Sequence, residues 1–384
     1  MKNYKSLLLL TAFTCSLFSS VAQAIETKAK NAVLMDFETG TFFFQKNADE
    51  KMPPASMSKL MTAYMIFERL KNGSLAMDDE FVVSENAWRK GGAKTGSSTM
   101  FLKIGDKVKL RDLLRGIIVQ SGNDACITAA ENIAGSEKEF VEQANRKAVE
   151  LGLNNTHLAN ATGWPHADHY MSPKDLAVLS RHIIQDFPEY YNIYSEKEFT
   201  YNGIKQENRN PLLFLMPGVA DGIKTGHTTV SGYGLVGSAK KNNRRIIMVI
   251  NGLKTMKERS EEAQRLISWG FRSFDNYKVL KKDVRVVNVP VWLGKMHSVA
   301  AVPHEDVVVT IAKGKQKEIT AKVTYEKPLS APVKKGQKVG SLVLRIPDQE
   351  DRSVDLFAAN DIKRQGYFGR LKELIKYVLF QNIN

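Results

Sequence analysis

The stretch Pro53–Leu70, PPASMSKLMTAYMIFERL, places a serine and a lysine at the start of an apolar helix. Ser56 and Lys59 are three positions apart, and residues at i and i+3 share a helix face, so the hydroxyl and the amine can meet. When the pattern is taken alone, a solvated lysine beside an ordinary helix N-terminus is the simpler explanation. The rest of the sequence has to decide between these two interpretations.

Two further motifs follow in the chain. Ser-Gly-Asn at 121–123 lies at a predicted junction of loop and helix, and Lys-Thr-Gly at 224–226 lies on a predicted strand. The order Ser-x-x-Lys, Ser-x-Asn, Lys-Thr-Gly is the motif set of penicillin-binding proteins and class A β-lactamases. Three motifs in this order arise by chance far less often than any one of them, which favours a functional interpretation of Ser56 and Lys59.

These residue types suit acyl transfer through a serine nucleophile. A serine hydroxyl is a weak nucleophile and needs a base within hydrogen-bonding distance. A lysine can be that base if its amine is held neutral. Burial and a second nearby ammonium both lower the pKa of a lysine, and Lys224 is the expected second cation. We therefore predict that Ser56 is the nucleophile and Lys59 its base.

The other motif residues are expected to act in the same reaction. Ser121 can pass a proton to the leaving nitrogen as a general acid, and Asn123 can orient Lys59 and the substrate. The backbone N–H groups of Ser56 and His227 are the expected oxyanion hole. Gly226 has no Cβ, so substrate backbone can lie against the strand. The predicted catalytic residues are Ser56, Lys59, Ser121, Asn123 and Lys224, and the predicted substrate-binding strand contains Thr225, Gly226, His227 and Thr228.

Outside these motifs the chain changes between predicted strands and helices. Residues 31–47, NAVLMDFETGTFFFQKN, are predicted to form a β-hairpin, and residues 75–190 are mostly helical. Residues 218–252 return to strands, with a Lys-Asn-Asn-Arg turn between two apolar runs. Residues 256–274 have helical periodicity and are expected to pack on that sheet. Strands at both ends with helices between them predict one sheet built from distant segments.

The C-terminal part of the sequence has a different pattern of predicted secondary structure. From about residue 285, short strands separated by turn residues predict a small all-β domain over 285–365. Residues 366–384, GYFGRLKELIKYVLFQNIN, are too short and too charged to span a bilayer. We predict an amphipathic helix on an anionic membrane surface, with docking on the protein itself as the alternative. Its apolar residues fall on one helical stripe: Tyr367, Leu371, Leu374, Ile375, Val378 and Leu379.

Length, charge and the N-terminal residues define the class of protein and its location. The 384 residues are 43% hydrophobic and 25% charged, which is typical of a soluble globular chain of about two domains. Residues 1–24 have early lysines, an apolar run and a small-x-small ending, and are predicted to be a signal peptide cleaved after Ala24. Cys126 is then the one cysteine left, and packing is its expected role. The net charge of +14 in an exported protein favours anionic lipid or wall polymer over nucleic acid as a partner.

The chain resembles the serine-type D-alanyl-D-alanine carboxypeptidases, the low-molecular-weight penicillin-binding proteins, from the signal peptide to the terminal helix. Besides the three motifs, similar stretches are LGLNNTHLANATG, EKEFTYNGIKQENRN, DGIKTGHT and LISWGFR. One difference is Gly163-Trp164-Pro165, where family members often have Gly-Leu. The resemblance implies that Arg209 and Arg259 hold the terminal carboxylate of the substrate, which suits the guanidinium fork. For each arginine alone, a solvated surface position is nearly as good an explanation.

The resemblance also implies a fold and an activity. The implied fold is a mixed α/β, penicillin-binding and serine β-lactamase-like catalytic domain (25–284) with an antiparallel sheet and a helical subdomain. A small all-β domain then sets it away from the membrane, and the terminal amphipathic helix anchors it at the periplasmic face of the bacterial inner membrane. The implied reaction removes the terminal D-alanine from peptidoglycan stem pentapeptides through an acyl-enzyme on Ser56. No metal or organic cofactor is expected, and β-lactams are the expected inhibitors.

Three other enzyme classes and a non-enzymatic role compete with this interpretation. A DD-endopeptidase acting on cross-linked peptides is the nearest alternative, and a wall-binding protein would have no use for a base. A β-lactamase needs a glutamate in Glu-x-x-Leu-Asn, and Glu150–Asn154 has this pattern, but Gly152 there indicates an ordinary helix end. A metallopeptidase would need a ligand set. Its candidates are loop residues that lack a His-Glu-x-x-His pattern: His157, His166, His169 and Asp168.

Overall fold

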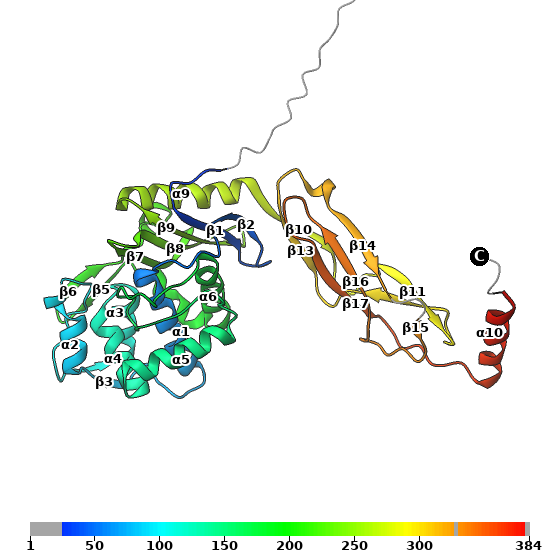
Figure 1. Ribbon diagram of the computed structural model, residues 1–384, viewed down its shortest axis with the longest axis horizontal. Coiled ribbons are helices and arrows are strands. Elements are labelled where there is room, and N and C mark those ends of the chain that lie inside the picture. The colour runs from blue at the N-terminus through cyan, green and yellow to red at the C-terminus, as the bar shows by residue number, and fades with distance from the viewer. Residues whose placement is uncertain (1–24, 326–328, 381–384) are drawn as a thin grey trace, which may run out of the picture.

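The structure is a computed structural model that describes residues 25–325 and 329–380. In the last helix it describes the side chains of residues 367–371, 374 and 375. The predicted signal peptide, 1–24, lies outside the described residues, as do the side chains of Val378 and Leu379. Figure 1 shows a mixed α/β body, an elongated β-rich part beside it, and a helix at the far end of the β-rich part.

The mixed α/β body is built on one five-stranded antiparallel sheet, which confirms the prediction that distant segments share a sheet. The N-terminal hairpin pairs with strands that come some 200 residues later, so that β1 lies against β9. The turn between β8 and β9 has Asn242 and Asn243 at positive φ (50° and 61°), which suits a two-residue hairpin turn. In sheet order the strands are β2 (Phe42–Lys46), β1 (Asn31–Asp36), β9 (Arg244–Leu253), β8 (Gly232–Lys241) and β7 (Ala220–Thr228).

Between β2 and β7 the chain is mostly helical, as predicted, and two short strand pairs interrupt it. The strand pairs are β3 (Glu80–Val82) with β4 (Lys107–Lys109) and β5 (Glu198–Tyr201) with β6 (Ile204–Glu207). The helices of this region, with short 3₁₀ turns marked η, are η1 (Ala55–Ser58), α1 (Lys59–Lys71), α2 (Glu85–Gly91), η2 (Ala93–Thr95), α3 (Leu110–Ile118), α4 (Asn123–Ala134), α5 (Glu137–Glu150), α6 (Pro173–Asp186), α7 (Pro188–Tyr191), η3 (Asn192–Ser195) and α8 (Leu212–Leu215). A further helix, α9 (Met256–Ser273), follows β9.

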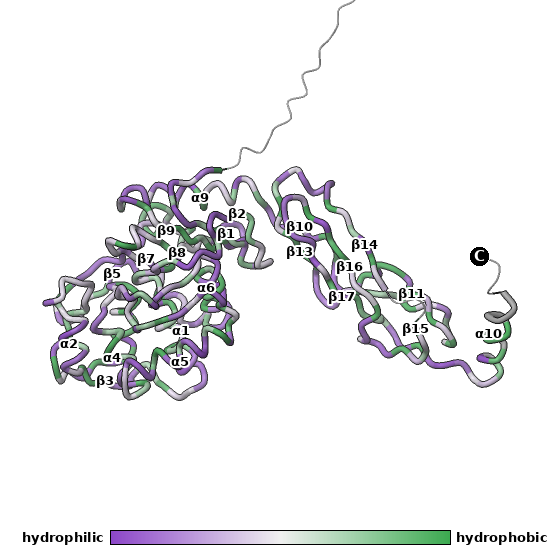
Figure 2. Tube along the Cα trace, in the orientation of Figure 1, coloured by the Kyte–Doolittle hydropathy of each residue, from purple (hydrophilic) through white to green (hydrophobic). Residues whose placement is uncertain are grey.

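Helices cover both faces of the sheet. α9 packs on β8 and β9 from one side, as the sequence predicted, while α6 packs on β1 and β9 from the other. The middle of β8 and of β9 is therefore buried on both faces, and the hydropathy colouring marks β9 as an apolar run inside the body (Figure 2). Two hydrophobic cores result, one on each side of the sheet.

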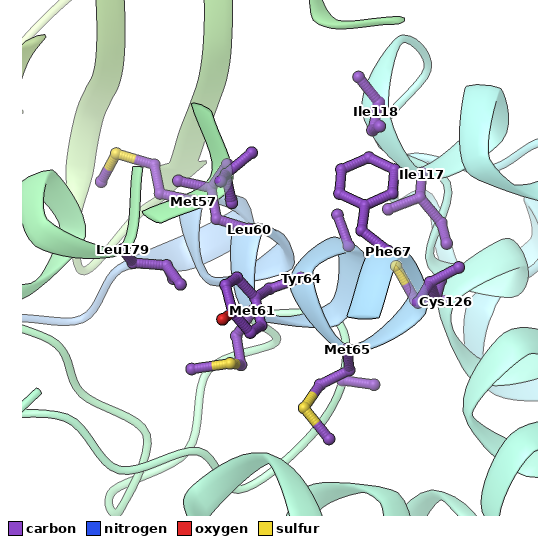
Figure 3. Packing of buried hydrophobic residues seen from close by; sticks show 14 of the residues in the cluster. Met57, Leu60, Met61, Tyr64, Met65, Phe67, Ile117, Ile118, Cys126 and Leu179 are labelled. Atoms are coloured by element: carbon purple, nitrogen blue, oxygen red, sulfur yellow. The ribbon is translucent and has the colours of Figure 1, made fainter. Parts of the chain in front are cut away.

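α1 is the central helix of the helical region, and every side chain from Lys59 to Phe67 is buried. Figure 3 shows apolar side chains leaving it in several directions, with Phe67 near Ile117 and Cys126. A helix that is buried on every face has no solvated face for its polar residues. Lys59, at its first position, is accordingly only 1% exposed. Ser56 differs from the expectation in one detail, since it lies in the 3₁₀ turn η1 that leads into α1.

The β-rich part contains a six-stranded sheet with the order β14-β16-β17-β12-β11-β15 and has a hydrophobic core of its own. The strand β10 (Phe274–Leu280) follows α9 directly and pairs with β13 (Val307–Ala312), so strand pairing of this part begins before residue 285. No turn residue separates α9 from β10 in the sequence. The other elements are β11 (Val287–Trp292), β12 (Ser298–Val302), η4 (Gln316–Glu318), β14 (Thr320–Thr324), β15 (Leu329–Ser330), β16 (Lys338–Arg345) and β17 (Arg352–Ala358).

The last helix, α10 (Tyr367–Phe380), lies at the end of the β-rich part that is remote from the mixed α/β body (Figure 1). Its described apolar side chains face solvent: Tyr367, Phe368, Leu371, Leu374 and Ile375. Among the residues that the structure describes, no helix is both long enough and apolar enough to cross a membrane.

Candidate active site

A cleft of about 920 Å³ separates the edge strand β7 from the helical region and is lined by residues of all three motifs. Ser56 contributes from η1, Ser121 and Asn123 contribute from the start of α4, and the strand β7 forms the opposite wall. The fold therefore brings together segments that are up to 170 positions apart in the sequence. The lysines of the first and third motifs lie beneath this surface, where both are buried.

Ser56 and Lys59 meet as the spacing predicts. The Lys59 amine lies 2.9 Å from the Ser56 hydroxyl oxygen. It has two more partners, the Asn123 side-chain oxygen at 2.7 Å and the Thr162 backbone carbonyl at 2.5 Å. Three oxygens therefore surround the amine and hold it against the half-buried serine.

The environment of Lys59 favours its neutral form. Burial is the main cause that lowers its pKa to about 8, and the positive charge of Arg209 acts in the same direction. Burial and the charges of Lys59 and Arg209 lower the pKa of Lys224 well below its ordinary value. The charge of Lys59 therefore disfavours protonation of Lys224. The expected effect of Lys224 on the pKa of Lys59 stays a prediction.

Ser121 and Lys224 form a second serine–lysine pair. The Lys224 amine donates to the Ser121 hydroxyl at 2.9 Å and to the carbonyl of Thr225 at 3.2 Å. Ser121 has a positive φ of 62°, which is uncommon for a residue with a side chain, and it is followed by Gly122, the N-cap residue of α4. The left-handed turn aims the hydroxyl across the cleft toward β7.

Asn123 links the first pair to the neighbouring loop. Its oxygen accepts from Lys59, and its nitrogen donates to the Ser97 hydroxyl at 3.1 Å. The adjacent Asp124 is fully buried and holds the same loop, accepting from the Met100 and Leu102 backbone N–H groups at 2.8 and 3.1 Å. A buried carboxylate is stable when it accepts several hydrogen bonds. The Ser-Gly-Asn-Asp sequence therefore organises the loop at 97–102 as well as the lysine.

Gly226 has a structural role that the sequence did not reveal. A Cβ at this position would lie 2.8 Å from the Pro54 carbonyl oxygen and 3.2 Å from the Ala55 Cβ. The glycine therefore allows β7 to approach η1, the turn that carries Ser56. The expected reason, room for substrate backbone, concerns the open side of the strand and stays a prediction.

The remaining predicted binding residues line the same cleft. Arg209 follows β6 and donates to the Ser98 hydroxyl, and Arg259 on α9 donates to the Arg209 carbonyl at 3.3 Å. Two guanidinium groups thus lie near each other in the lining of the cleft. His227 is exposed and stacks on Tyr233 at 3.8 Å between ring centroids. Thr225 and Thr228 belong to the same stretch of β7.

Sequence reasoning missed several residues of the cleft. The Thr162 carbonyl is a partner of Lys59, but a backbone acceptor leaves no mark in a sequence. Ser97 and Ser98 contact Asn123 and Arg209, and nothing in the run at 97–98 distinguishes them from loop serines. Trp164 lines the cleft with 51% of its surface exposed. The one available signal was that Gly163-Trp164-Pro165 stands where members of the resembled family often have Gly-Leu.

The residues of the competing enzyme classes do not form sites. Glu150 ends α5, is exposed and pairs with Lys147, and Gly152 follows at a positive φ of 72°, as expected for a helix end. Within 25–325 and 329–380, no group of His, Cys, Asp or Glu side chains is arranged to hold a metal ion. His169 is buried and accepts from the Ala159 N–H at 3.1 Å. Burial raises the pKa of the Cys126 thiol to about 12, which agrees with a packing role.

The fold and the two serine–lysine pairs define a penicillin-binding type of serine enzyme that forms an acyl intermediate. The family model described as D-alanyl-D-alanine carboxypeptidase, peptidase S11, matches residues 18–255. A second model, the C-terminal domain of penicillin-binding protein 5, matches residues 274–364. The chain belongs to the D-alanyl-D-alanine carboxypeptidase family, which confirms the family predicted from the motifs.

Individual relatives agree with this assignment over nearly the whole chain. The D-alanyl-D-alanine carboxypeptidase DacC of Escherichia coli K12 is 39% identical over 370 residues, covering 96% of this chain and 92% of the relative. The crystal structure of penicillin binding protein 5 from Haemophilus influenzae has a TM-score of 0.81 at 39% identity, covering 88% of this chain and 99% of that one. Penicillin-binding protein D2 of Listeria monocytogenes, solved in an ampicillin-bound form, has a TM-score of 0.56 at 29% identity over 64% of this chain and 98% of that one. The enzyme class and the fold are those predicted, and a β-lactamase is not favoured.

Proposed function

We propose that this enzyme removes the terminal D-alanine from peptidoglycan stem peptides through an acyl-enzyme on Ser56. The observation that carries the proposal is the occurrence of two serine–lysine pairs in one cleft, each with a 2.9 Å contact. One pair supplies a nucleophile and its base. The other supplies a hydroxyl with its own buried amine, which is suited to deliver a proton to a leaving group.

The first step is attack by Ser56 on the carbonyl of the penultimate D-alanine. As the Ser56 oxygen bonds to that carbon, its proton passes to neutral Lys59, whose lowered pKa near 8 makes it a base close to neutral pH. Negative charge develops on the carbonyl oxygen. The backbone N–H groups of Ser56 and His227 are the proposed donors that stabilise it.

The second step breaks the peptide bond and releases D-alanine. The leaving nitrogen needs a proton, and the Ser121 hydroxyl can give one while it receives another from the amine of Lys224, 2.9 Å away. Arg209 and Arg259, with Thr225 and Thr228, are the proposed holders of the terminal carboxylate, since guanidinium groups pair with carboxylates through two hydrogen bonds. Water then hydrolyses the ester on Ser56 and restores the enzyme. None of the steps needs a metal or an organic cofactor.

β-Lactams are proposed inhibitors of the same serine. Their ring amide presents a carbonyl in the position of the scissile bond, so that Ser56 can open the ring. The leaving nitrogen then stays covalently attached to the acyl group, and it blocks the approach of water. The ampicillin-bound relative supports this proposal by analogy of fold.

The proposed organisation places this site on the outer side of the inner membrane. Residues 1–24 direct export, 25–284 carry the reaction, 285–365 act as a β-rich spacer, and 366–384 lie on an anionic membrane surface. Support comes from the exposed apolar side chains of α10, of which Phe368 is 85% exposed, at the end of the molecule that is remote from the cleft. Apolar residues beside basic ones suit the boundary between lipid tails and anionic headgroups.

The direct test is D-alanine release from a short acyl-D-Ala-D-Ala peptide by the mature chain. We expect Ser56→Ala to lower the rate on the order of 10³-fold or more, because the nucleophile acts in every turnover. Ser58→Ala is the matched control, since the Ser58 hydroxyl donates to the Ala55 carbonyl at 3.1 Å and is not one of the three oxygens that contact the Lys59 amine. Release by Ser56→Ala at the parent rate would refute the proposal. Release only from cross-linked dimers would favour a DD-endopeptidase.

A further inference from the structure

Asn160 organises the turn on the helical side of the cleft. Its side-chain oxygen accepts from the Thr162 hydroxyl at 2.9 Å and from the backbone N–H groups of Thr162, Gly163 and Trp164 at 3.1, 2.8 and 3.0 Å. Its nitrogen donates to the Trp164 carbonyl at 2.9 Å. An asparagine that bonds to the backbone two to four residues ahead fixes a turn in one conformation.

The turn held by Asn160 is attached to the helix that carries the catalytic lysine. The Thr162 carbonyl accepts from Lys59, and the preceding carbonyl of Ala161 accepts from the Thr62 hydroxyl at 2.7 Å, three positions further along α1. Gly163 has a φ of +80°, and a Cβ there would lie 2.1 Å from the Ala55 carbonyl oxygen. The turn therefore packs directly against η1 and α1, with no space for it to slide.

The partners of Lys59 determine the direction of its lone pair. A neutral amine has two hydrogens and one lone pair, and Lys59 has three oxygen neighbours. The amide oxygen of Asn123 and the carbonyl of Thr162 can only accept. Both hydrogens are used by these two oxygens, so the lone pair points at the third neighbour, the Ser56 hydroxyl. Without the Thr162 carbonyl, one hydrogen could turn toward Ser56 and the amine would no longer be set to receive its proton.

We propose that Asn160 is a positioning residue for the reaction, because it holds the Thr162 carbonyl on the Lys59 amine and so directs the lone pair of that amine to Ser56. Asn160 does not contact Ser56 or Lys59 and acts through the turn. The inference rests on the proposed function, since it assumes that Lys59 is the base for Ser56.

The test is the second-order rate of Ser56 acylation by a fluorescent penicillin, measured from pH 6 to 10 on the mature chain. Asn160→Ala removes the side-chain amide that holds the turn. We expect the acylation rate to fall about 10- to 100-fold at every pH, which is the loss expected when a catalytic group is misplaced. Asn160→Asp keeps the accepting oxygen and loses only the exposed donation to the Trp164 carbonyl. The negative charge of the new carboxylate should favour protonated Lys59. The pH at which the acylation rate rises should therefore move upward by roughly 0.5–1 pH unit. Above that pH, acylation should return to within about fivefold of the parent.

The charged and titratable groups around Lys59 are the same in all variants, so the shift reports on the new carboxylate. These groups come from several elements: Asp124 and Cys126 on α4, Lys224 on β7, Arg209 after β6, and His169 before α6. Asn72→Ala is the matched control. Asn72 accepts from the Ser74 N–H and hydroxyl at 3.0 and 2.7 Å in a comparable turn at the far end of α1.

The outcomes separate the inference from the proposed function. Acylation of folded Asn160→Ala within twofold of the parent would overturn the inference. If Asn160→Ala does not fold, the Asp variant decides, and an equal loss of rate at all pH values without a shift in the pH at which the rate rises would also overturn it. If Ser56→Ala is still acylated, the proposed function itself fails.

Discussion

Lys59 and Thr162 are 103 positions apart in the chain, yet the Lys59 amine lies 2.5 Å from the Thr162 carbonyl oxygen. The contact is buried and is one of three that surround the amine. It joins the central helix to the wall of the cleft, so that the base is held by the fold as well as by its neighbours in sequence.

The first prediction concerns pH. Lys59 must be neutral to accept the proton of Ser56, and its pKa is lowered to about 8. Acylation by penicillin should therefore rise about tenfold per pH unit below pH 8 and level off above it. Lys59→Arg should be inactive over this whole range, because a guanidinium stays charged. A flat profile for the parent between pH 6 and 9 would contradict the assignment of Lys59 as base.

The second prediction concerns Gly226. A methyl group there would meet the backbone oxygen of Pro54, so β7 and η1 would have to move apart. We expect Gly226→Ala to lower the unfolding free energy by about 1–3 kcal/mol, as overpacking does. Acylation should fall at least about tenfold, because Ser56 is displaced from the strand. Denaturant unfolding and the rate of penicillin labelling measure the two effects.

Gly366→Ala is the control for this substitution, since no atom lies within 4 Å of its Cβ position. The explanation by close approach fails if Gly226→Ala labels as fast as the parent.

The third prediction concerns Trp164. Its indole lines the cleft and is half exposed, so a bound stem peptide can cover it. Trp164→Ala should raise KM for a peptide substrate about 2- to 12-fold, since an aromatic contact contributes about 0.5–1.5 kcal/mol. The kcat and the melting temperature should change little. Phe214→Ala, an exposed aromatic outside the cleft, is the comparison. An unchanged KM would show that substrate does not cover the indole.

The fourth prediction concerns the junction between the two parts of the molecule. The Asn276 side chain on β10 donates to Asp36 and to Glu38, both at 3.0 Å, and Thr39 contacts Thr310 at 2.6 Å. Asn276→Ala should lower stability by about 1–3 kcal/mol, because it removes two hydrogen bonds to carboxylates. Calorimetry measures this loss.

Asn288→Ala, an exposed asparagine on β11, is the control for the junction. The kcat/KM for a short peptide should be the same in both variants, since the junction does not line the cleft. A parent-like melting temperature for Asn276→Ala would mean that these bonds do not couple the two parts.

The fifth prediction concerns α10. Removal of residues 367–384 should lower binding to vesicles containing anionic phosphatidylglycerol at least about tenfold, with no change in D-alanine release from a soluble peptide. Phe368→Glu, at a highly exposed position, should weaken binding in the same direction. Sedimentation with anionic and with neutral vesicles measures both variants. Undiminished binding by the shortened chain would place the membrane contact elsewhere.

Much of the architecture was predictable from local patterns. The apolar stretch after Lys59 is a helix, and α9 packs on the sheet, as the patterns predicted. The β8–β9 hairpin also turns at Asn242–Asn243, where the sequence has turn residues. The start of the β-rich part was less clear. β10 follows α9 without a turn residue. It pairs with β13, which is distant in the sequence, and no local pattern predicts which strand it pairs with.

The sequence by itself determined which chemical groups meet, because Ser56 and Lys59 are one helical turn apart and the order of three motifs specifies a serine enzyme of the penicillin-binding and β-lactamase type. The tertiary structure alone decided how these groups are oriented. The Thr162 carbonyl, the Asn160 turn and the space that Gly226 leaves for Pro54 all depend on contacts between distant segments. Backbone oxygens are the same in every residue, so only the packing of the chain determines which of them reaches a catalytic amine.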